Sequence, residues 1–361
     1  MNIKIITDER DFLYLRDRWE KLFWENGIYP FTSWIWNYTW WKYYGKGKKL
    51  FIITFWEDDE LVAIIPLMKV FGEMGLPFWR LKFIASDCSD YLDILYNPKY
   101  EELIINNFLN CIDLCLGSLI IADFEHIPDG SFMLKLSKLI KNLNIEVMEQ
   151  DICPYLELPG SWEELKKNLN KRFRKNIEYA ERRLSREFNV IYREVRKETD
   201  ILNSLDKLMI LHQQRMNRRF MPGAFFSYKK RLFHKDLVDY MAQEDMVRIY
   251  DLVIEQKCVG SLYAFIKGKS LYYYLSGFDV NYKKYSPGMV LLSYVIKTSI
   301  SEGFEVFDFL RGEEEYKFLW TDRYRINYRI LIGKTNVISH LLSKLIRTEN
   351  IIEKKIKKAF I

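Results

Sequence analysis

The same order of elements is predicted twice along the chain: helices, a hairpin of two strands, a strand, a helix and a strand. In the first half the β-rich segments 50–55 and 61–67 enclose an acidic turn and form the hairpin. In the second half, segments 246–255 and 258–267 form the equivalent hairpin. The halves share this pattern without sharing residue identities, and 361 residues suffice for about two domains. We therefore predict an α/β (α+β) chain of two units, each a mixed, mostly antiparallel sheet flanked by helices.

Four segments are expected along the chain. Residues 1–160 form the first unit, 161–190 a basic linking helix, 191–335 the second unit, and 336–361 an amphipathic, basic C-terminal helix. The linking segment is rich in Lys and Arg but also in Glu. Much of it is therefore expected to be a solvated helix face with i, i+4 ion pairs.

The C-terminal helix has two interpretations. Apolar residues at helical spacing precede the basic run 354–358, and these residues are Val337, Ile338, Leu341, Leu342, Leu345 and Ile346. Such a helix lies on a membrane surface, or it packs on the protein and leaves a solvated basic end. We favour the packed helix and keep peripheral membrane contact as the alternative.

Charge and cysteine content exclude several classes of protein. The net charge of +6 is too small for a dedicated nucleic-acid binder, so DNA is not an expected partner, although a local excess suits an anionic ligand. The charged N-terminus lacks the apolar core of a signal peptide, and no uninterrupted apolar run approaches the roughly 18–20 residues that span a bilayer. Five scattered cysteines argue against a disulfide framework, and Cys111 and Cys115 have no histidine nearby to complete a metal site. We expect a cytoplasmic protein without a metal, and the sequence predicts no oligomeric state.

A strand, a loop and a helix follow one another between residues 271 and 302. Pro287 suits the first helical turn, and Gly288 beside it leaves backbone N–H groups unobstructed. Such a helix end carries partial positive charge and holds a phosphate or pyrophosphate, here near Ser286, Gly288 and Met289. The alternative is a simple connection between strand and helix.

The next predicted strand contains Asp308 among apolar residues, where a charge is costly unless it is paired or hydrogen-bonded. Gly312 ends the strand and permits close backbone approach. Tyr316 and Lys317 then project beyond the strand end, which is where open α/β sheets bind ligands. The alternative is that Asp308 holds a loop and Lys317 is merely exposed.

Two further pairs of residues are candidates for substrate binding. His212 lies in a predicted helix with Arg215 at i+3, so both can face a cleft, although a single helical histidine is often structural. The basic excess around Arg172 and Arg174 suits a phosphate on the donor or on a nucleotide- or lipid-linked acceptor. With four histidines and no Ser-His-Asp or Cys-His arrangement, a covalent triad is not expected.

These motifs resemble one family. The matching features are Gly277-Phe278-Asp279, Tyr285-Ser286-Pro287-Gly288, Phe307-Asp308-Phe309 with Gly312, and Tyr316-Lys317 with Trp320, supported by weaker matches at 31–34, 64–67, 89–93, 172–176 and 211–215. With them the chain resembles the GNAT superfamily, specifically the CelD-like acyltransferases linked to exopolysaccharide synthesis, which are relatives of the Fem peptide-bridge transferases. The resemblance extends to about residue 334 and implies two tandem GNAT-like units.

The resemblance also implies a reaction. The second unit would transfer an acyl group from acetyl-CoA or another acyl-CoA to an amino or hydroxyl group of a sugar or cell-surface glycan precursor. The donor would bind at the segment 286–289, which includes Pro287, and near Gly312. Asp308 would orient or deprotonate the acceptor, Lys317 would stabilise negative charge, and Tyr316 would return a proton to the leaving thiolate. The residues expected on the substrate side are Arg172, Arg174, His212, Arg215 and Trp320.

One departure from the family pattern leaves two alternatives. Typical GNAT enzymes carry a Gln/Arg-x-x-Gly-x-Gly/Ala loop where this chain has Ser-Pro-Gly-Met at 286–289. The Fem relatives also lack that loop and use aminoacyl-tRNA, so a tRNA partner and a peptidoglycan precursor form the first alternative. The second is a non-catalytic binding protein that kept the fold. The first unit, which has no comparable Pro-Gly junction, is expected to be degenerate in this way.

Overall fold

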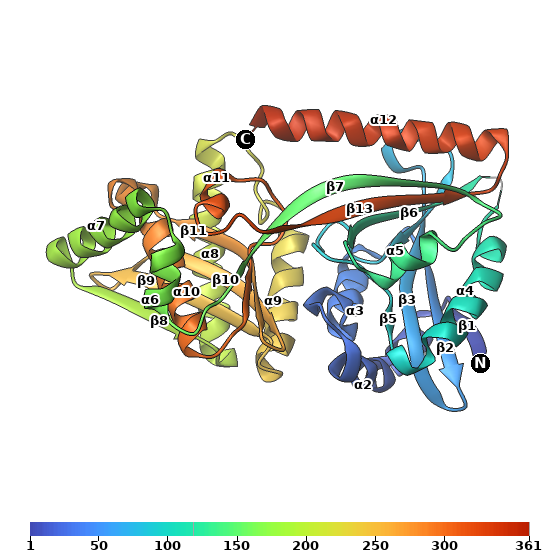
Figure 1. Cartoon of the computed structure of the whole chain (residues 1–361), viewed down its shortest axis with the longest axis horizontal. Coiled ribbons are helices and arrows are strands. Elements are labelled where there is room, and N and C mark those ends of the chain that lie inside the picture. The colour runs from blue at the N-terminus through green and yellow to red at the C-terminus, as the bar shows by residue number, and fades with distance from the viewer. Residues whose placement is uncertain (118, 361) are drawn as a thin grey trace. The chain divides into compact units, whose positions relative to one another are not determined.

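The computed structural model describes residues 1–117 and 119–360, and the chain folds into two compact units (Figure 1). Unit 1 is made of Met1–Ile152 and Arg325–Ile361, and unit 2 of the continuous segment Cys153–Tyr324 between them in sequence. Among the described residues, no helix has both the length and the apolar content needed to cross a bilayer.

Unit 1 is a mixed sheet with strand order β1-β2-β3-β4-β6-β13-β7, and the short β5 pairs with β3. The strands are β1 (Asn2–Ile6), β2 (Lys49–Glu57), β3 (Glu60–Phe71), β4 (Trp79–Phe83), β5 (Leu95–Tyr96), β6 (Ile120–Pro128), the first part of β7 (Asn144–Glu157) and β13 (Tyr324–Gly333). The helices are α1 (Glu9–Tyr14), α2 (Arg16–Asn26), α3 (Trp34–Tyr44), α4 (Glu101–Cys115), α5 (Phe132–Ser137) and α12 (Val337–Phe360), with 3-10 turns η1 (Pro30–Thr32), η2 (Glu73–Gly75) and η3 (Pro98–Tyr100). β4 and β6 run parallel, whereas the other unit 1 pairings with a described register are antiparallel.

Apolar and charged side chains alternate along three adjacent strands of unit 1, β4, β6 and β13. Leu81 and Ile330 point to one face, where they join the apolar core under α4 and α5. Successive side chains of a strand point to opposite faces, so Arg80, Asp123 and Arg329 lie on the other face, which α12 covers (Figure 1). The sheet therefore has one apolar face and one charged face. We call the charged face, which carries Arg80, Asp123 and Arg329, the ionic face.

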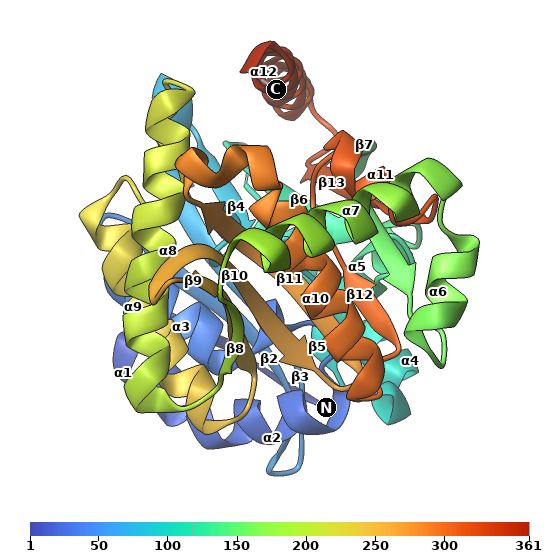
Figure 2. The same ribbon diagram turned by 90° about the vertical axis from the view of Figure 1, so that its left-hand side faces the viewer.

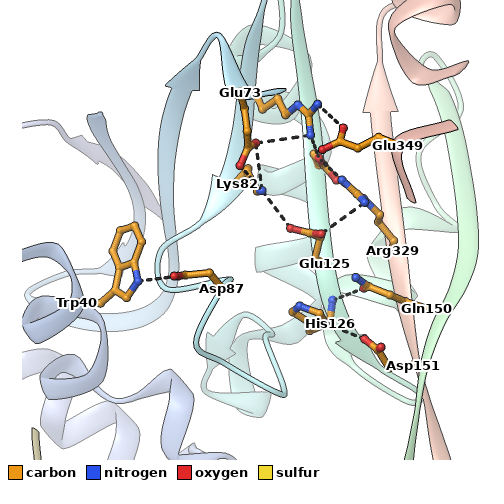
Figure 3. A network of polar contacts seen from close by, with 12 residues as sticks. Trp40, Glu73, Lys82, Asp87, Glu125, His126, Gln150, Asp151, Arg329 and Glu349 are labelled. Atoms are coloured by element: carbon orange, nitrogen blue, oxygen red, sulfur yellow. Dashed lines mark hydrogen bonds and ion pairs between the residues drawn. The ribbon is translucent and has the colours of Figure 1, made fainter. Parts of the chain in front are cut away.

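Asp123 is the centre of a buried charge network on the ionic face. Figure 3 shows other members of this network, among them Lys82, Glu125 and Arg329. The two oxygens of Asp123 accept hydrogen bonds from Nε and Nη2 of Arg329, each at 2.7 Å, and Oδ2 lies 3.3 Å from Nη1 of Arg80. Arg80 also donates to Glu349 of α12 at 2.5 Å. Asp123, Arg80 and Arg329 are at most 1% exposed. Because a buried charge without a partner is costly, each of them depends on the others.

Lys82 and Glu125 extend the same network, with Nζ of Lys82 3.0 Å from the Glu125 carboxylate. Burial on its own raises the pKa of Glu125, but Lys82 and Arg329 outweigh burial and hold that pKa well below its usual range. Burial likewise lowers the pKa of Lys82, yet the carboxylates of Glu125 and Asp123 keep it above its usual value. Both groups are therefore charged at neutral pH.

Replacement of Asp123 tests the dependence of unit 1 on this network. Asp123→Asn removes the charge that compensates Arg329 and Arg80, so we expect the free energy of unfolding to fall by about 3 kcal/mol. Urea denaturation followed by tryptophan fluorescence reports mainly on unit 1, because the tryptophans other than Trp162 and Trp320 lie there. The matched control is Asp113→Asn, whose partner Lys334 is 2.6 Å away but whose carboxylate is half-exposed. The control should change stability by less than about 1 kcal/mol, and equal effects of the two substitutions would contradict the prediction.

Unit 2 contains a sheet with strand order β7-β12-β11-β10-β9-β8. Besides the last residues of β7, its strands are β8 (Val190–Val195), β9 (Val247–Ile254), β10 (Lys257–Lys267), β11 (Ser270–Phe278) and β12 (Val306–Asp308). Its helices are α6 (Trp162–Asn168), α7 (Lys171–Glu187), α8 (Glu198–Arg218), α9 (Tyr228–Gln243), α10 (Pro287–Ser301) and α11 (Glu315–Phe318), with the 3-10 turn η4 (Val280–Tyr285). Only β11 and β12 run parallel among the unit 2 pairings with a described register.

The predicted fold class, a mixed sheet flanked by helices, is confirmed, and so is the repeated order of elements. In unit 1 the order β2, β3, β4, α4, β6 ends in a parallel strand after a helical crossover, as does β9, β10, β11, α10, β12 in unit 2. Two details differ from expectation. The linking segment forms two helices, because the Asn170 side chain accepts from the backbone of Arg172 at 2.9 Å and starts α7. The last strand, expected in the second unit, joins unit 1 because β13 pairs with β6.

Helix α8 packs closely on β11 at Gly277. A Cβ at Gly277 would lie 2.5 Å from the backbone N of His212 and 2.9 Å from the carbonyl C of Leu211, so only glycine allows this approach. Gly260 on the neighbouring strand faces α10, and its Cβ would meet no atom closer than 3.4 Å, with Leu291 of α10 at 3.5 Å. Helices α8 and α10 therefore cover opposite faces of this sheet, and α7 packs beside α10 (Figure 2).

The two glycines provide a matched pair of substitutions. Gly277→Ala forces α8 away from β11, so we expect it to destabilise unit 2 by about 1–3 kcal/mol, the usual cost of overpacking. Gly260→Ala fills ordinary van der Waals space and should change stability far less. Thermal denaturation followed by circular dichroism compares the variants. A melting temperature lowered equally by both, or by neither, would show that the contact at Gly277 does not limit packing.

Candidate functional site

Strands β11 and β12 pair over only three residues and then separate. Their parallel ladder ends where Tyr272 lies opposite Asp308, whereas β11 continues to Phe278. After Asp308 the chain follows β7 instead, because the N–H of Phe309 donates to the carbonyl of Pro154 at 2.9 Å. One edge of β11 beyond Tyr272 is thus left without a β12 partner. Such an opening at the carboxyl ends of parallel strands is a usual place for a ligand.

Asp308 holds the turn that separates the two strands. Its side chain is fully buried, and Oδ1 accepts from the backbone N–H of Leu310 at 2.8 Å. Leu310 has a φ of 57°, in the left-handed region that a leucine seldom adopts. The carboxylate therefore stabilises a strained turn at the point where the strand ends.

Lys317 closes the loop that follows. Its ammonium lies 2.7 Å from the carbonyl of Arg311 and 3.5 Å from that of Leu310, and 2.9 Å from the carboxylate of Glu314. Its side chain is 4% exposed, so the charge faces the loop and not solvent. Gly312 has a φ of 122°, and a Cβ there would lie 2.3 Å from a Glu314 oxygen. The loop therefore depends on both Lys317 and glycine at position 312.

A chain of three hydroxyls lies at the separation of the strands. The hydroxyl of Tyr316, from α11, is hydrogen-bonded to that of Tyr273 on β11, which is bonded in turn to Ser276. Burial is the main cause that raises the pKa of both tyrosines above the ordinary value. Tyr316 as a whole residue is 37% exposed. Both tyrosines are therefore protonated at neutral pH and can donate hydrogen bonds.

Helix α8 places His212 and Arg215 beside the same strand. Nδ1 of His212 donates to the carbonyl of Ser276 at 3.0 Å, and Nε2 accepts from the N–H of Ala224 at 3.3 Å. Burial, with a smaller effect from Arg215, lowers the pKa of His212, so the ring is neutral and both nitrogens are in use. The Arg215 guanidinium lies 5.2 Å from the ring centre of Phe278. His212 thus positions β11, while Arg215 supplies positive charge near Tyr273 and Tyr316.

Helix α10 follows β11 and the turn η4, and after the exposed Ser286 its first residues are buried or half-buried. Pro287 is its first residue, and Ser286 before it has a φ of 53° and an exposed side chain that caps no N–H group. The Ser286 carbonyl accepts from the N–H groups of Met289 and Val290 at 3.0 and 3.1 Å. A Cβ at Gly288 would lie 3.5 Å from the Phe278 ring, an ordinary contact.

Basic side chains gather at this end of the helix. Nη1 of Arg183 donates to the carbonyl of Lys284 at 3.3 Å, and both residues place their charges over the ring of Tyr285, at 4.9 and 4.8 Å. Cationic side chains and the positive end of the helix dipole therefore occur together at 283–288. This combination suits a phosphate.

Three predicted residues lie elsewhere in unit 2. Trp320 is 3% exposed, and its ring packs against Phe173 and Trp162 at centroid distances of 5.0 and 6.4 Å. Arg174 donates to the carbonyl of Lys166 at 3.4 Å, and Arg172 is exposed on α7. In the described part of the chain, none of these contacts involves the hydroxyl groups of Tyr316, Tyr273 and Ser276.

Tyr273 and Ser276 were not singled out from the sequence. Both lie in the segment Tyr272-Tyr273-Tyr274-Leu275-Ser276, where three consecutive tyrosines give no indication of which one faces the site. The register shift between Tyr263 and Ala264 on β10 makes the alternation along β11 irregular at this point. No group of three or more His, Cys, Asp and Glu side chains suited to a metal occurs among the described residues.

Comparison with known proteins gives one matching family model and several solved structures with a similar fold. Residues 171–318 match the family model of the acetyltransferase (GNAT) domain. The crystal structure of FemX is similar with a TM-score of 0.59 at 10% identity, covering 96% of this chain and 100% of that one. The structure of L-PGS from Bacillus licheniformis gives 0.56 at 14% identity, covering 94% and 97%. The C-terminal domain of a putative lysylphosphatidylglycerol synthetase from Agrobacterium fabrum gives 0.54 at 10% identity, covering 92% and 95%.

At these identities the solved structures establish the fold alone, and no curated protein sequence matches the chain significantly. The β11–β12 opening, the hydroxyl chain and the N-terminus of α10 all fall within the matched segment. Residues 171–318 are therefore similar to a GNAT acetyltransferase domain, within a chain that shares its overall fold with FemX.

Proposed function

We propose that unit 2 transfers an acyl group from acyl-CoA to an amine or hydroxyl group, at the opening between β11 and the loop 309–314. The observation that carries the proposal is that β11 runs on to Phe278 after its ladder with β12 has ended at Tyr272. A strand edge beyond the end of its ladder can offer backbone N–H and C=O groups to an extended ligand such as the pantetheine arm of CoA. The match of residues 171–318 to an acetyltransferase domain supports the same reaction.

The N-terminus of α10 is proposed to hold the pyrophosphate of the donor. Ser286, Gly288 and Met289 contribute the helix end, and Lys284 and Arg183 add positive charge. This assignment places the acyl end of an extended donor along β11, toward Tyr273.

Tyr316 is proposed as the proton donor. In the transfer, the acceptor nitrogen or oxygen bonds to the acyl carbon, the C–S bond breaks, and the thiolate takes the proton of Tyr316. The acceptor releases its proton to solvent, from which Tyr316 is reprotonated. Tyr273 orients the Tyr316 hydroxyl, and Arg215 lies close enough to offset negative charge that develops at the site.

Asp308 and Lys317 are proposed to position the loop that carries Tyr316. Asp308 is fully buried and bonded to the turn, and the Lys317 ammonium is engaged by Arg311 and Glu314. This differs from direct action on the substrate, which the sequence suggested for both. As acceptor we propose a cell-surface glycan precursor, supported by the resemblance of the motifs at 277–288 and 307–320 to exopolysaccharide-linked acyltransferases.

Substitutions at Gly288 test donor binding. Gly288→Glu places a negative charge at the proposed pyrophosphate site, so we expect the affinity for CoA to fall at least about tenfold. The change does not weaken the helix, because an acidic side chain near the N-terminus stabilises it. Gly288→Ala, whose Cβ fits at 3.5 Å from the Phe278 ring, serves as the neutral control and should retain most of the affinity. Isothermal titration calorimetry with CoA measures both.

Two calorimetric results contradict acyl-CoA as donor. One is wild-type protein that does not bind CoA at millimolar concentration. The other is Gly288→Glu protein that binds CoA as well as the wild type.

Substitution of Tyr316 tests the proton donor. Tyr316→Phe removes the hydroxyl and keeps the ring, so we expect kcat to fall about 100-fold with little change in the KM for the donor. The control is Tyr179→Phe on α7, since Tyr179 is 60% exposed and belongs to the same unit. Steady-state assays that follow thiol release over a panel of amino and hydroxyl acceptors provide the measurement. A Tyr316→Phe enzyme as fast as the control would exclude Tyr316 as the proton donor.

A second candidate is transfer of an aminoacyl group from aminoacyl-tRNA at the same site. Two observations favour it: residues 286–289 lack the Gln/Arg-x-x-Gly-x-Gly/Ala loop, and FemX shares the fold over 96% of this chain. Co-purification of tRNA, together with no CoA binding, would support this donor. If neither ligand binds, unit 2 is a binding module without this activity.

A further inference from the structure

Helix α12 buries polar residues and exposes apolar ones. On the side that faces unit 1, Ser339, Ser343 and Asn350 are buried. On the exposed side the large apolar residues are between 45% and 75% exposed, and they are Val337, Ile338, Leu341, Leu345, Ile351 and Ile352. A helix on the surface of a soluble protein normally has the opposite arrangement, with its apolar stripe facing the core.

The polar side of α12 is held in place by the ionic face of unit 1. Glu349 binds the buried Arg80 at 2.5 Å, and Ile346 packs into a small apolar cluster with Phe78, Ile121 and Leu331. If the helix rolled to bury its apolar residues, Arg80 and Ile346 would lose these partners. The outward direction of the apolar side is therefore fixed by the sheet beneath it.

Most of the exposed apolar residues lie along one face of the helix, which the polar Thr348 interrupts. Ile338, Leu341, Leu345 and Ile352 are spaced i, i+3, i+7 and i+14, which places them on one face of a helix. We call these four residues the apolar stripe of α12. The helix extends over 24 residues, so it is about 36 Å long at 1.5 Å per residue.

The charges around the stripe are positive. Lys344 and Arg347 are exposed, and the one acidic residue between Val337 and Ile352 is Glu349, which is engaged by Arg80. The sequence of the next helical segment, 353–360, adds four lysines and one glutamate. An apolar stripe with cationic flanks is the composition of a helix that lies in the interface of an anionic membrane.

We propose that α12 attaches the protein to the surface of a membrane that contains anionic lipids. The apolar stripe enters the boundary between headgroups and acyl chains, and Lys344 and Arg347 meet lipid phosphates. A second copy of the chain is a poorer occupant of the same face, because it would bring two sets of these cations together without exposed acidic partners on the described part of the helix. The proposal does not depend on the acyl-transfer reaction.

Vesicle flotation with the full chain tests the proposal. We expect wild-type protein to float with phosphatidylcholine vesicles that contain phosphatidylglycerol, and much less with phosphatidylcholine alone. Replacing Leu341 and Leu345 together by Ser should reduce the bound fraction at least about tenfold, since apolar burial drives insertion. Reversing both charges, with Lys344→Glu and Arg347→Glu, should reduce binding to the anionic vesicles about fivefold or more per charge.

Matched controls separate the stripe from general surface effects. Leu103→Ser on α4 removes an apolar residue as exposed as those of the stripe, at 46%, and Lys46→Glu and Lys138→Glu reverse two exposed charges elsewhere on unit 1. All these positions are exposed, so circular dichroism melting should be unchanged in every variant. Wild-type protein that stays unbound, or stripe variants that float like the Leu103→Ser control, would overturn the proposal. So would light scattering that shows a dimer which the stripe substitutions dissociate, together with no vesicle binding.

Discussion

The bidentate pair between Asp123 and Arg329 is the interaction on which unit 1 depends. Its two hydrogen bonds, each 2.7 Å long, join β6 to β13. In sequence, these two strands are separated by the whole of unit 2. Because both residues are fully buried, neither charge is tolerable without the other. Arg80 connects the same carboxylate to Glu349 and hence to α12. The placement of β13, the closure of the ionic face and the direction of α12 all follow from this one buried carboxylate.

The sequence predicted the parts of the fold that depend on local pattern. The hairpins were recognised because β-rich runs flank short turns, and α10 begins at Pro287, as its ring geometry favours. The return of β13 to unit 1 was not predicted, because strand pairing between distant segments leaves no periodic signal in either strand. Apolar and charged residues alternate in β4, β6 and β13, but from the sequence alone this alternation does not indicate that the three strands are neighbours. A charged face of a sheet is expected to meet water, and here it meets α12.

The sequence indicates the candidate site as a segment, and the structure adds how its side chains are arranged. The junction at Ser286–Gly288 and the loop from Asp308 to Lys317 lie at the ends of β11 and β12, as the order of elements suggested. The roles of individual side chains depend on where the backbone turns. The left-handed turn at Leu310 directs Asp308 and Lys317 into the loop, whereas Tyr273 and Ser276 lie on either side of a bulge at Tyr274 in β11. Such turns arise from local strain and packing, which residue types at fixed spacing do not encode.

The discontinuity of unit 1 sets the order in which the chain can fold during synthesis. Unit 2 is continuous, so all of it is available once Tyr324 has left the ribosome. Unit 1 begins earlier but lacks β13 and α12 until residues 325–360 are made, and until then Asp123 has no Arg329 beside it. The domain that starts first must therefore finish last, which reverses the usual N-terminal-first order of multidomain proteins. A nascent chain that stalls after residue 324 and before residue 329 would hold all of unit 2 attached to an unfinished unit 1, whose β6 would offer chaperones the strand edge that β13 later covers.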